Sequence, residues 1–289
     1  MRAITVPEQV RSGELLVVAS VSGGKDSTAL ILALREADVP ARSVFADTQW
    51  EAPETYAYLD TLREKLGIVI DVVGVEGGMP AKIAKRAGFP SRIQRWCTRE
   101  LKIEPLRDYH DATGVETVSV MGVRAEESLS RSRMCEWEDD DEWGGYVWRP
   151  LLAWPVEDVI AIHHRHGVPM NPLYLRGHGR VGCYPCIFSQ KEEIRLIAEH
   201  APERIDAIRR LELEMDALRV ERNVEKPGRY AHMLATFFMS IDRRKPNQID
   251  AVVDWSRTSR GGKQLPLLPE PPTGGCMRWG MCEPPEATK

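Results

Sequence analysis

Apolar and polar positions along the chain alternate in blocks that predict strands and helices in turn. A run rich in β-branched residues at 15–21 is typical of a buried strand. Further strands are expected at 41–45, 68–75 and 115–123. Helical segments are expected between them, at 27–37, 51–66 and 97–109. Strands that alternate with helices predict an α/β fold with a doubly wound parallel sheet, which binds ligands at the carboxyl ends of its strands.

The pattern changes after residue 124, where the regular alternation stops. Six acidic residues within 136–142 predict a solvated loop, and residues 201–220 predict an amphipathic helix. A helix at 156–164 is followed by a loop, and we expect surface positions for His163, His164 and His166. Residues 266–275 are rich in proline and glycine and predict an extended tether. The chain is thus divided into an α/β domain at 1–195, a helical C-terminal extension at 196–265, and a tether with a cysteine-containing tail at 266–289.

The most informative segment, Ser22-Gly-Gly-Lys-Asp-Ser27, joins the first strand to its helix. Such a turn directs several backbone N–H groups, and the positive end of the helix dipole, at one point. Gly23 and Gly24 lack the Cβ atoms that would block close approach, Lys25 adds a mobile cation, and the two serines add hydroxyl donors. The spacing differs from that of the Walker loop and the dinucleotide loop. The segment therefore predicts a phosphate site of another type.

Composition and charge limit the class of protein. The 289 residues are 43% hydrophobic and 28% charged, as in ordinary globular proteins, and the net charge of −4 disfavours non-specific polyanion binding. The N-terminal segment has no signal-peptide core, and no apolar run reaches 18 residues, so we expect a cytoplasmic protein without a membrane partner. In a reducing compartment, the six cysteines are interpreted as metal ligands or reactive thiols rather than disulfides.

Two further segments follow predicted strands at the same edge of the sheet. Asp47 and Thr48 end the second strand, where they could contact the ribose or adenine of a nucleotide or, equally, belong to a helix N-cap. Gly122 and Arg124 follow the fourth strand, and Arg131 comes shortly after. The planar donor fork of arginine suits phosphate, whereas the alternative is a surface network of arginine and glutamate.

The cysteines suggest a thiolate site. Cys183 and Cys186 form a C-x-x-C turn that can chelate one metal ion or one cluster edge, with a thioredoxin-like redox pair as the alternative. Cys97 is the natural third ligand. A fourth would come from Cys135, Cys276 or Cys282, and the tethered tail favours the last two. Four thiolates fit either zinc or a [4Fe–4S] cluster.

Six motifs occur together in one order along the chain. They are Ser22 to Ser27, Asp47-Thr48 with Pro53-Glu-Thr-Tyr56, Lys102-Ile-Glu-Pro-Leu106, Gly122-Val-Arg-Ala-Glu-Glu-Ser128, Asn171-Pro-Leu-Tyr174 and Gly182-Cys-x-x-Cys186. Over about residues 14–190 the chain resembles the phosphoadenosine-phosphosulfate reductase family, which belongs with the N-type ATP pyrophosphatases and has an adenine nucleotide alpha-hydrolase-like fold. The resemblance implies that the loop holds ATP or adenylyl sulfate, with Arg124 and Arg131 near its phosphate or sulfate end.

The chain also departs from the iron–sulfur reductases of that family. They carry adjacent cysteines before the segment that matches Lys102 to Leu106, whereas here Cys97 is followed by Thr98. The Glu-Cys-Gly-Leu-His-like tail of the assimilatory reductases, whose cysteine attacks the sulfate sulfur, is replaced by a different sequence around Cys276 and Cys282. Residues 96–103 and 128–133 look closer to sulfur-transfer members of DNA phosphorothioation systems and their phage relatives.

The leading hypothesis is an ATP pyrophosphatase that adenylates a substrate oxygen so that sulfur can replace it. Lys25, Asp26, Arg124 and Cys282 are assigned as catalytic residues, and Mg²⁺ would neutralise the leaving pyrophosphate. Kinship favours a [4Fe–4S] cluster over zinc, and this cluster would bind or deliver sulfur from a donor such as a cysteine desulfurase. Its ligands would be Cys97, Cys183, Cys186 and Cys276.

Other partners and functions stay open. A nucleic acid is a candidate acceptor, although the basic residues of its footprint could equally form solvated helix faces. That footprint comprises Arg209, Arg210, Arg219, Arg222, Arg243, Arg244 and Lys245. One alternative enzyme is a sulfonucleotide reductase, in which the thiol of Cys282 or Cys276 takes sulfur from adenylyl sulfate. The non-enzymatic alternative is a regulator that binds nucleotide and metal without turnover.

Overall fold

The computed structural model describes residues 2–140, 145–225, 234–238 and 248–259. The predicted tether and tail at 266–289 lie outside the described residues, and so do Cys276, Cys282, Arg243, Arg244 and Lys245. In the part of the chain that is described, no helix is long and apolar enough to cross a membrane. Because the tail lies outside the described residues, the division of the chain into three parts stays a prediction.

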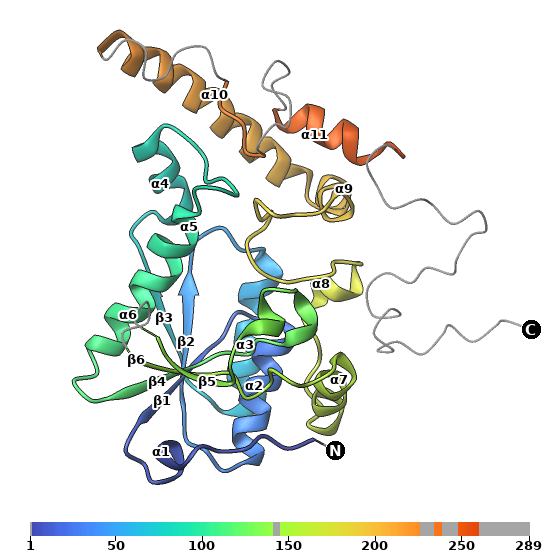
Figure 1. Ribbon diagram of the computed structural model, residues 1–289. Coiled ribbons are helices and arrows are strands. Elements are labelled where there is room, and N and C mark those ends of the chain that lie inside the picture. The colour runs from blue at the N-terminus through green and yellow to red at the C-terminus, as the bar shows by residue number, and fades with distance from the viewer. Residues whose placement is uncertain (1, 141–144, 226–233, 239–247, 260–289) are drawn as a thin grey trace, which may run out of the picture.

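Within these residues, six strands form one sheet in the order β3-β2-β1-β4-β6-β5 (Figure 1). The strands are β1 (Leu16–Ser20), β2 (Arg42–Asp47), β3 (Ile70–Gly74), β4 (Thr117–Val120), β5 (Trp137–Asp140) and β6 (Gly145–Trp148). Pairing is parallel except between β5 and β6. The chain runs outward from β1 to β3 and then returns to the other side of β1. This reversal, between β1 and β4, is where doubly wound sheets bind ligands.

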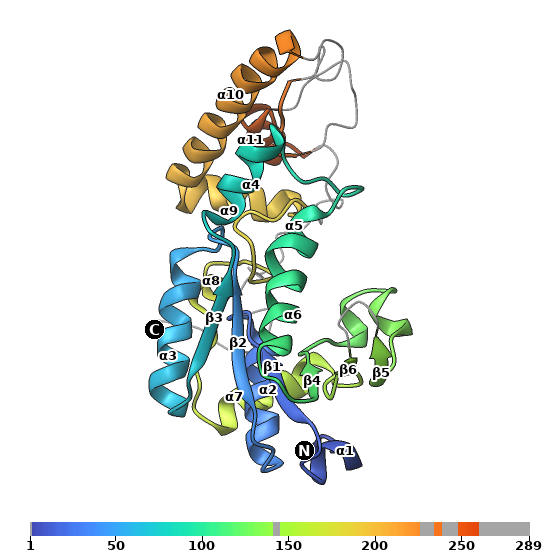
Figure 2. The ribbon, with the colours of Figure 1, turned by 90° about the vertical axis from the view of Figure 1, so that its left-hand side faces the viewer.

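Helices cover both faces of the sheet, as the doubly wound fold requires. Figure 2 shows α3 (Pro53–Leu66) and α6 (Glu104–Asp111) on opposite sides of the strands. Alternation along β1 directs Val17 into the core beneath α2 (Lys25–Glu36), α3 and α7 (Val156–Arg165), while Val18 packs with Leu106 of α6. The expected α/β architecture is confirmed.

The predicted helix at 97–109 is divided. It consists of α5 (Trp96–Thr98), a five-residue π-helix (Arg99–Ile103) and α6, which continues from it. A π-helix widens the turn and rotates the side chains that follow, and such segments are frequent at functional sites. The widened turn contains Lys102, whose surroundings are described below.

The C-terminal helices form a second core with loops of the α/β domain. They are α9 (Lys191–His200), α10 (Pro202–Glu225) and α11 (Ile249–Ser256), and α4 (Gly78–Arg86) joins them. Figure 1 shows this group beyond the carboxyl end of β2. Ile208 of α10 and Phe237 share the cluster with Trp50 and Tyr184, so the extension packs directly onto the loops at that end of the sheet. The shorter helices are α1 (Glu8–Arg11), α8 (Pro172–Leu175) and the 3₁₀ turns Ala125–Glu127 and Arg131–Arg133.

The solvated loop expected at 136–142 is wrong where the structure describes it, because residues 137–140 form β5. Trp137 stacks on Tyr146 of β6, with ring centroids 5.4 Å apart. The buried guanidinium of Arg149 forms an ion pair with Glu138 and donates to the Cys135 carbonyl at 3.0 Å. One arginine and one aromatic pair thus stabilise an acidic edge strand that charge alone would keep solvated.

Candidate active site

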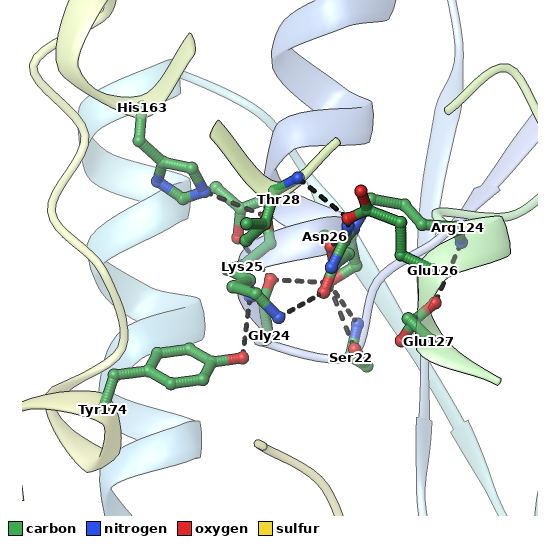
Figure 3. Close-up of polar contacts among 12 residues, drawn as sticks. Ser22, Gly24, Lys25, Asp26, Thr28, Arg124, Glu126, Glu127, His163 and Tyr174 are labelled. Carbon is green, nitrogen blue, oxygen red and sulfur yellow. Dashed lines mark hydrogen bonds and ion pairs between the residues drawn. The ribbon is translucent and has the colours of Figure 1, made fainter. Parts of the chain in front are cut away.

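The predicted phosphate loop closes on itself at the carboxyl end of β1 (Figure 3). The backbone N–H and the hydroxyl of Ser22 both lie 3.1 Å from Ser27 Oγ, and the Ser27 hydroxyl donates to the Gly24 carbonyl at 3.0 Å. Gly23 has φ +71°, and a Cβ there would lie 2.9 Å from a methyl carbon of Thr55. Glycine is therefore required both by the backbone angle and by the neighbouring helix.

Two cations converge on one carboxylate at this loop. The Lys25 ammonium lies 2.8 Å from one Asp26 oxygen, and Arg124 Nε lies 2.5 Å from the other. Lys25 and Arg124 are only 6% and 4% exposed. Burial by itself raises the pKa of Asp26, but the attraction of Lys25 and Arg124 outweighs it and holds that pKa below its usual value. The carboxylate therefore stays ionised and fixes both cations beside the loop.

Gly122 brings Arg124 to Asp26. A Cβ at Gly122 would lie 2.6 Å from the Asp26 carbonyl oxygen and 3.0 Å from the Ser27 nitrogen. The end of β4 therefore touches the first turn of α2 through backbone atoms. The structure thus places Gly122 and Arg124 against the loop, as the sequence suggested.

Arg131 behaves differently from Arg124. Its side chain is 39% exposed and forms an ion pair with Glu127. Glu127 in turn accepts the Arg124 backbone N–H at 2.9 Å, and the Arg124 guanidinium also contacts Glu126 at 2.7 Å. For Arg131 the arrangement is the arginine–glutamate network considered as the alternative.

Three residues that contact the loop were not assigned to it from the sequence. Asn171 donates to the Gly23 carbonyl at 3.0 Å, and the Tyr174 hydroxyl lies 3.2 Å from the Lys25 backbone nitrogen. His163 Nε2 lies 2.9 Å from the Lys25 carbonyl oxygen (Figure 3). The surface position expected for His163 is wrong, since it is 2% exposed. Asn171 and Tyr174 stand in a motif that could have indicated them, whereas His163 has no sequence signal.

Asp47 and Thr48 lie at the end of β2, and their side chains bond within the following loop. Asp47 accepts hydrogen bonds from the Tyr56 hydroxyl and the Gln49 N–H, both at 2.8 Å. The buried Thr48 hydroxyl donates to Glu51 at 2.7 Å. Because α3 starts only at Pro53 and neither side chain caps it, the N-cap alternative does not apply.

Cys97, Cys183 and Cys186 pack against one apolar cluster, the core of the C-terminal helices. Burial raises the pKa of the Cys97 thiol, and repulsion from the Cys183 and Cys186 thiolates adds to this effect. Lys102 has its pKa raised chiefly by attraction to Cys183. Cys135 is exposed and does not belong to this cluster. Among the described residues, no group of three or more cysteine, histidine or acidic side chains has the spacing of a metal site.

A cavity of about 470 Å³ lies beside β3 and α6, lined by residues that include Lys82, Glu100 and Tyr109. None of its lining residues belongs to the phosphate loop or is a cysteine. Within the loop Ser22 is exposed, whereas Gly23, Gly24, Lys25 and Ser27 are buried.

Several known proteins are similar to this chain in sequence or in fold. Residues 16–189 match the phosphoadenosine phosphosulfate reductase domain. A 37.8 kDa protein from the gpa 5′ region of Escherichia phage 186 is 33% identical over 87% of this chain and 91% of its own length. The adenosine 5′-phosphosulfate reductase of Allochromatium vinosum is 29% identical over 59% of this chain and 67% of its own. The structure of a phosphoadenylyl-sulfate reductase from Candida auris superposes with a TM-score of 0.47 at 18% identity, covering 63% of this chain and 98% of that one. More than half of the chain matches one domain family, and the chain belongs to the phosphoadenosine phosphosulfate reductase domain family.

Proposed function

We propose that this chain is an ATP pyrophosphatase that activates a substrate oxygen for replacement by sulfur. The observation that carries the proposal is the pair of buried cations, Lys25 and Arg124, held by Asp26 at the reversal point of the sheet. A preorganised positive site beside a helix N-terminus suits a polyphosphate whose charge increases as a bond breaks.

In the proposed reaction, the acceptor oxygen attacks the α-phosphorus of ATP, and the bond to the β-phosphate bridging oxygen breaks with release of pyrophosphate. A sulfur nucleophile then displaces AMP together with the activated oxygen. The loop N–H groups and Lys25 would hold the β- and γ-phosphates, and Arg124 would face the developing charge. Mg²⁺, when bound, supplies further neutralisation of the pyrophosphate. Both Asp26 oxygens already accept from cations, so the ion would be held chiefly by the nucleotide's own phosphates.

The three clustered thiols are proposed to hold the cofactor. Their donor chemistry fits a [4Fe–4S] cluster or zinc, and the half-buried apolar surroundings resemble those of thiolate sites. Since the described thiols do not by themselves have the spacing of a metal site, we propose Cys276 of the tail as the fourth ligand and Cys282 as the mobile reactive thiol. The cofactor, when bound, would supply a sulfur-binding centre fed by a donor such as a cysteine desulfurase.

The acceptor proposed for this reaction is a nucleic acid, but its footprint differs from the predicted one. Arg209 pairs with Asp206 and Asp250, so this member of the predicted footprint is occupied within the fold. Arg219 and Arg222 donate to the last carbonyls of α4, which they cap. These three residues are therefore structural.

Two other arginines are better placed for a phosphate backbone. Exposed Arg92 and Arg95 lie over the ring of Phe188, with guanidinium carbons 5.6 and 4.9 Å from its centroid. Phe188 is two residues from Cys186. Both guanidinium groups are exposed and contact the Phe188 ring, and we propose that they contact the phosphates of the acceptor.

A product assay distinguishes the candidate activities. Pyrophosphate release from ATP, dependent on Lys25, supports the proposed pyrophosphatase. Sulfite release from adenylyl sulfate in the presence of a dithiol reductant, lost in C282S, would instead identify a sulfonucleotide reductase, the activity for which the Allochromatium vinosum relative is named. Nucleotide binding with neither product would identify a regulator.

A further inference from the structure

Trp50 lies between the two parts of the proposed site. It follows Thr48 by two residues at the end of β2 and is 2% exposed. Its indole stacks on Phe237, with ring centroids 5.8 Å apart and planes inclined by 22°. The Arg204 guanidinium carbon lies 4.6 Å from the ring centroid. The extension thus holds the indole through two contacts.

The same residue is bonded to the C-x-x-C turn. The indole N–H donates to the Pro185 carbonyl at 3.1 Å, and the Trp50 carbonyl accepts the Tyr184 N–H at 2.8 Å. The next residue, Glu51, pairs with Cys183 in an antiparallel bridge. Both residues between the two cysteines are therefore attached to Trp50.

On the nucleotide side, Trp50 is attached to the end of β2 by a short chain of hydrogen bonds. Glu51 is buried, with 4% of its surface exposed. Its carboxylate accepts hydrogen bonds from the Trp50 backbone N–H at 3.2 Å and from the Thr48 hydroxyl at 2.7 Å. The Tyr56 hydroxyl lies 2.8 Å from Asp47 and 3.5 Å from Glu51. These hydrogen bonds connect Asp47 and Thr48 to Trp50 through Glu51 and Tyr56.

We propose that Trp50 is a positioning residue through which nucleotide binding sets the geometry of the Cys183–Cys186 turn. The proposal rests on the nucleotide site proposed above, with Asp47 and Thr48 contacting the ribose or adenine of the nucleotide. A ligand that restricts the motion of Asp47 and Thr48 also restricts Trp50. The two hydrogen bonds from Trp50 to Tyr184 and Pro185 then restrict the turn. The thiols would then be aligned only when the nucleotide is present.

The experiment measures amide hydrogen exchange of residues 182–188 in the full chain, with and without the non-hydrolysable ATP analogue adenylyl imidodiphosphate. In the wild type, the analogue should slow exchange in this segment about fivefold, the effect of strengthening one hydrogen bond. W50F keeps an aromatic ring for stacking but removes the donor to Pro185. It should bind the analogue with unchanged affinity in calorimetry, yet lose a large part of the protection, because only the backbone bond to Tyr184 remains. W255F, at a position 40% exposed on α11, is the matched control and should behave as the wild type.

Protection of residues 182–188 that is as large in W50F as in the wild type would overturn the proposal. Wild-type protein that binds the analogue without any change in this segment would do the same, whether or not W50F folds. Wild-type protein that does not bind the analogue in calorimetry would refute the nucleotide site itself and the coupling with it.

Discussion

Replacing Gly122 by alanine tests whether the contact between β4 and α2 builds the anion site. The new Cβ would lie 2.6 Å from the Asp26 carbonyl oxygen and 2.8 Å from its carbonyl carbon, and ordinary contacts begin at 3.4 Å. The two backbone segments must separate by about 0.8 Å, because no flexible side chain can yield. Crowding of this kind costs about 1–3 kcal/mol of folding free energy.

The same shift affects the paired cations. Arg124 Nε lies only 2.5 Å from Asp26 Oδ1, and Arg124 follows Gly122 by two residues. Moving the end of β4 away from α2 lengthens this contact to the limit of a useful hydrogen bond. We expect roughly tenfold weaker nucleotide binding, which corresponds to about 1.4 kcal/mol.

Urea unfolding measures the loss of stability, and calorimetric titration with ATP measures the loss of affinity. The control is Gly179→Ala, because Gly179 is exposed and a Cβ there meets nothing within 4 Å. If G122A matches the wild type in both assays, the close approach of β4 and α2 does not support the anion site, and the reasoning is refuted.

Further predictions concern the loop, the extension and the tail. In calorimetric titration, K25A should weaken ATP binding roughly 10- to 100-fold because it removes a charged donor, whereas K65A, at an exposed position of α3, should leave the affinity unchanged. Burial raises the pKa of Glu212 to about 7, although it accepts N–H bonds from Phe237 and Ile249, at 2.9 and 2.8 Å. The folded chain therefore retains a proton there that the unfolded chain releases near pH 4.5, so stability should fall as the pH rises from 4.5 to 7. Urea unfolding of E212Q should show a flatter dependence, and an unchanged profile would contradict the assignment. C276S should lose bound iron or zinc in elemental analysis while C282S keeps it; equal metal content in both variants would exclude Cys276 as the ligand.

Much of the site was predictable because its signals are local. The phosphate loop needs glycines and a cation within six residues, between a strand and a helix, so it can be identified without knowing the remaining fold. The same holds for the pairing of Cys183 and Cys186 in one turn. Strands β1 to β4 likewise follow from short β-branched runs, whereas β5 and β6 were not predicted. In each case the residues that specify the feature lie close together in the sequence.

The tertiary structure alone decided which distant groups meet at the loop. Both Arg124 and Arg131 follow β4, and only the backbone contact at Gly122 makes Arg124 the buried partner of Asp26. His163 has an ordinary position on a predicted helix, but the packing of α7 against α2 brings its ring to the Lys25 carbonyl. Trp50 meets the cysteine turn because an antiparallel bridge joins Glu51 to Cys183. These contacts join residues about 100 or more positions apart, and they depend on how helices and loops pack against the sheet. Hydrophobic periodicity indicates whether a residue is buried or exposed, but not which distant residue it contacts.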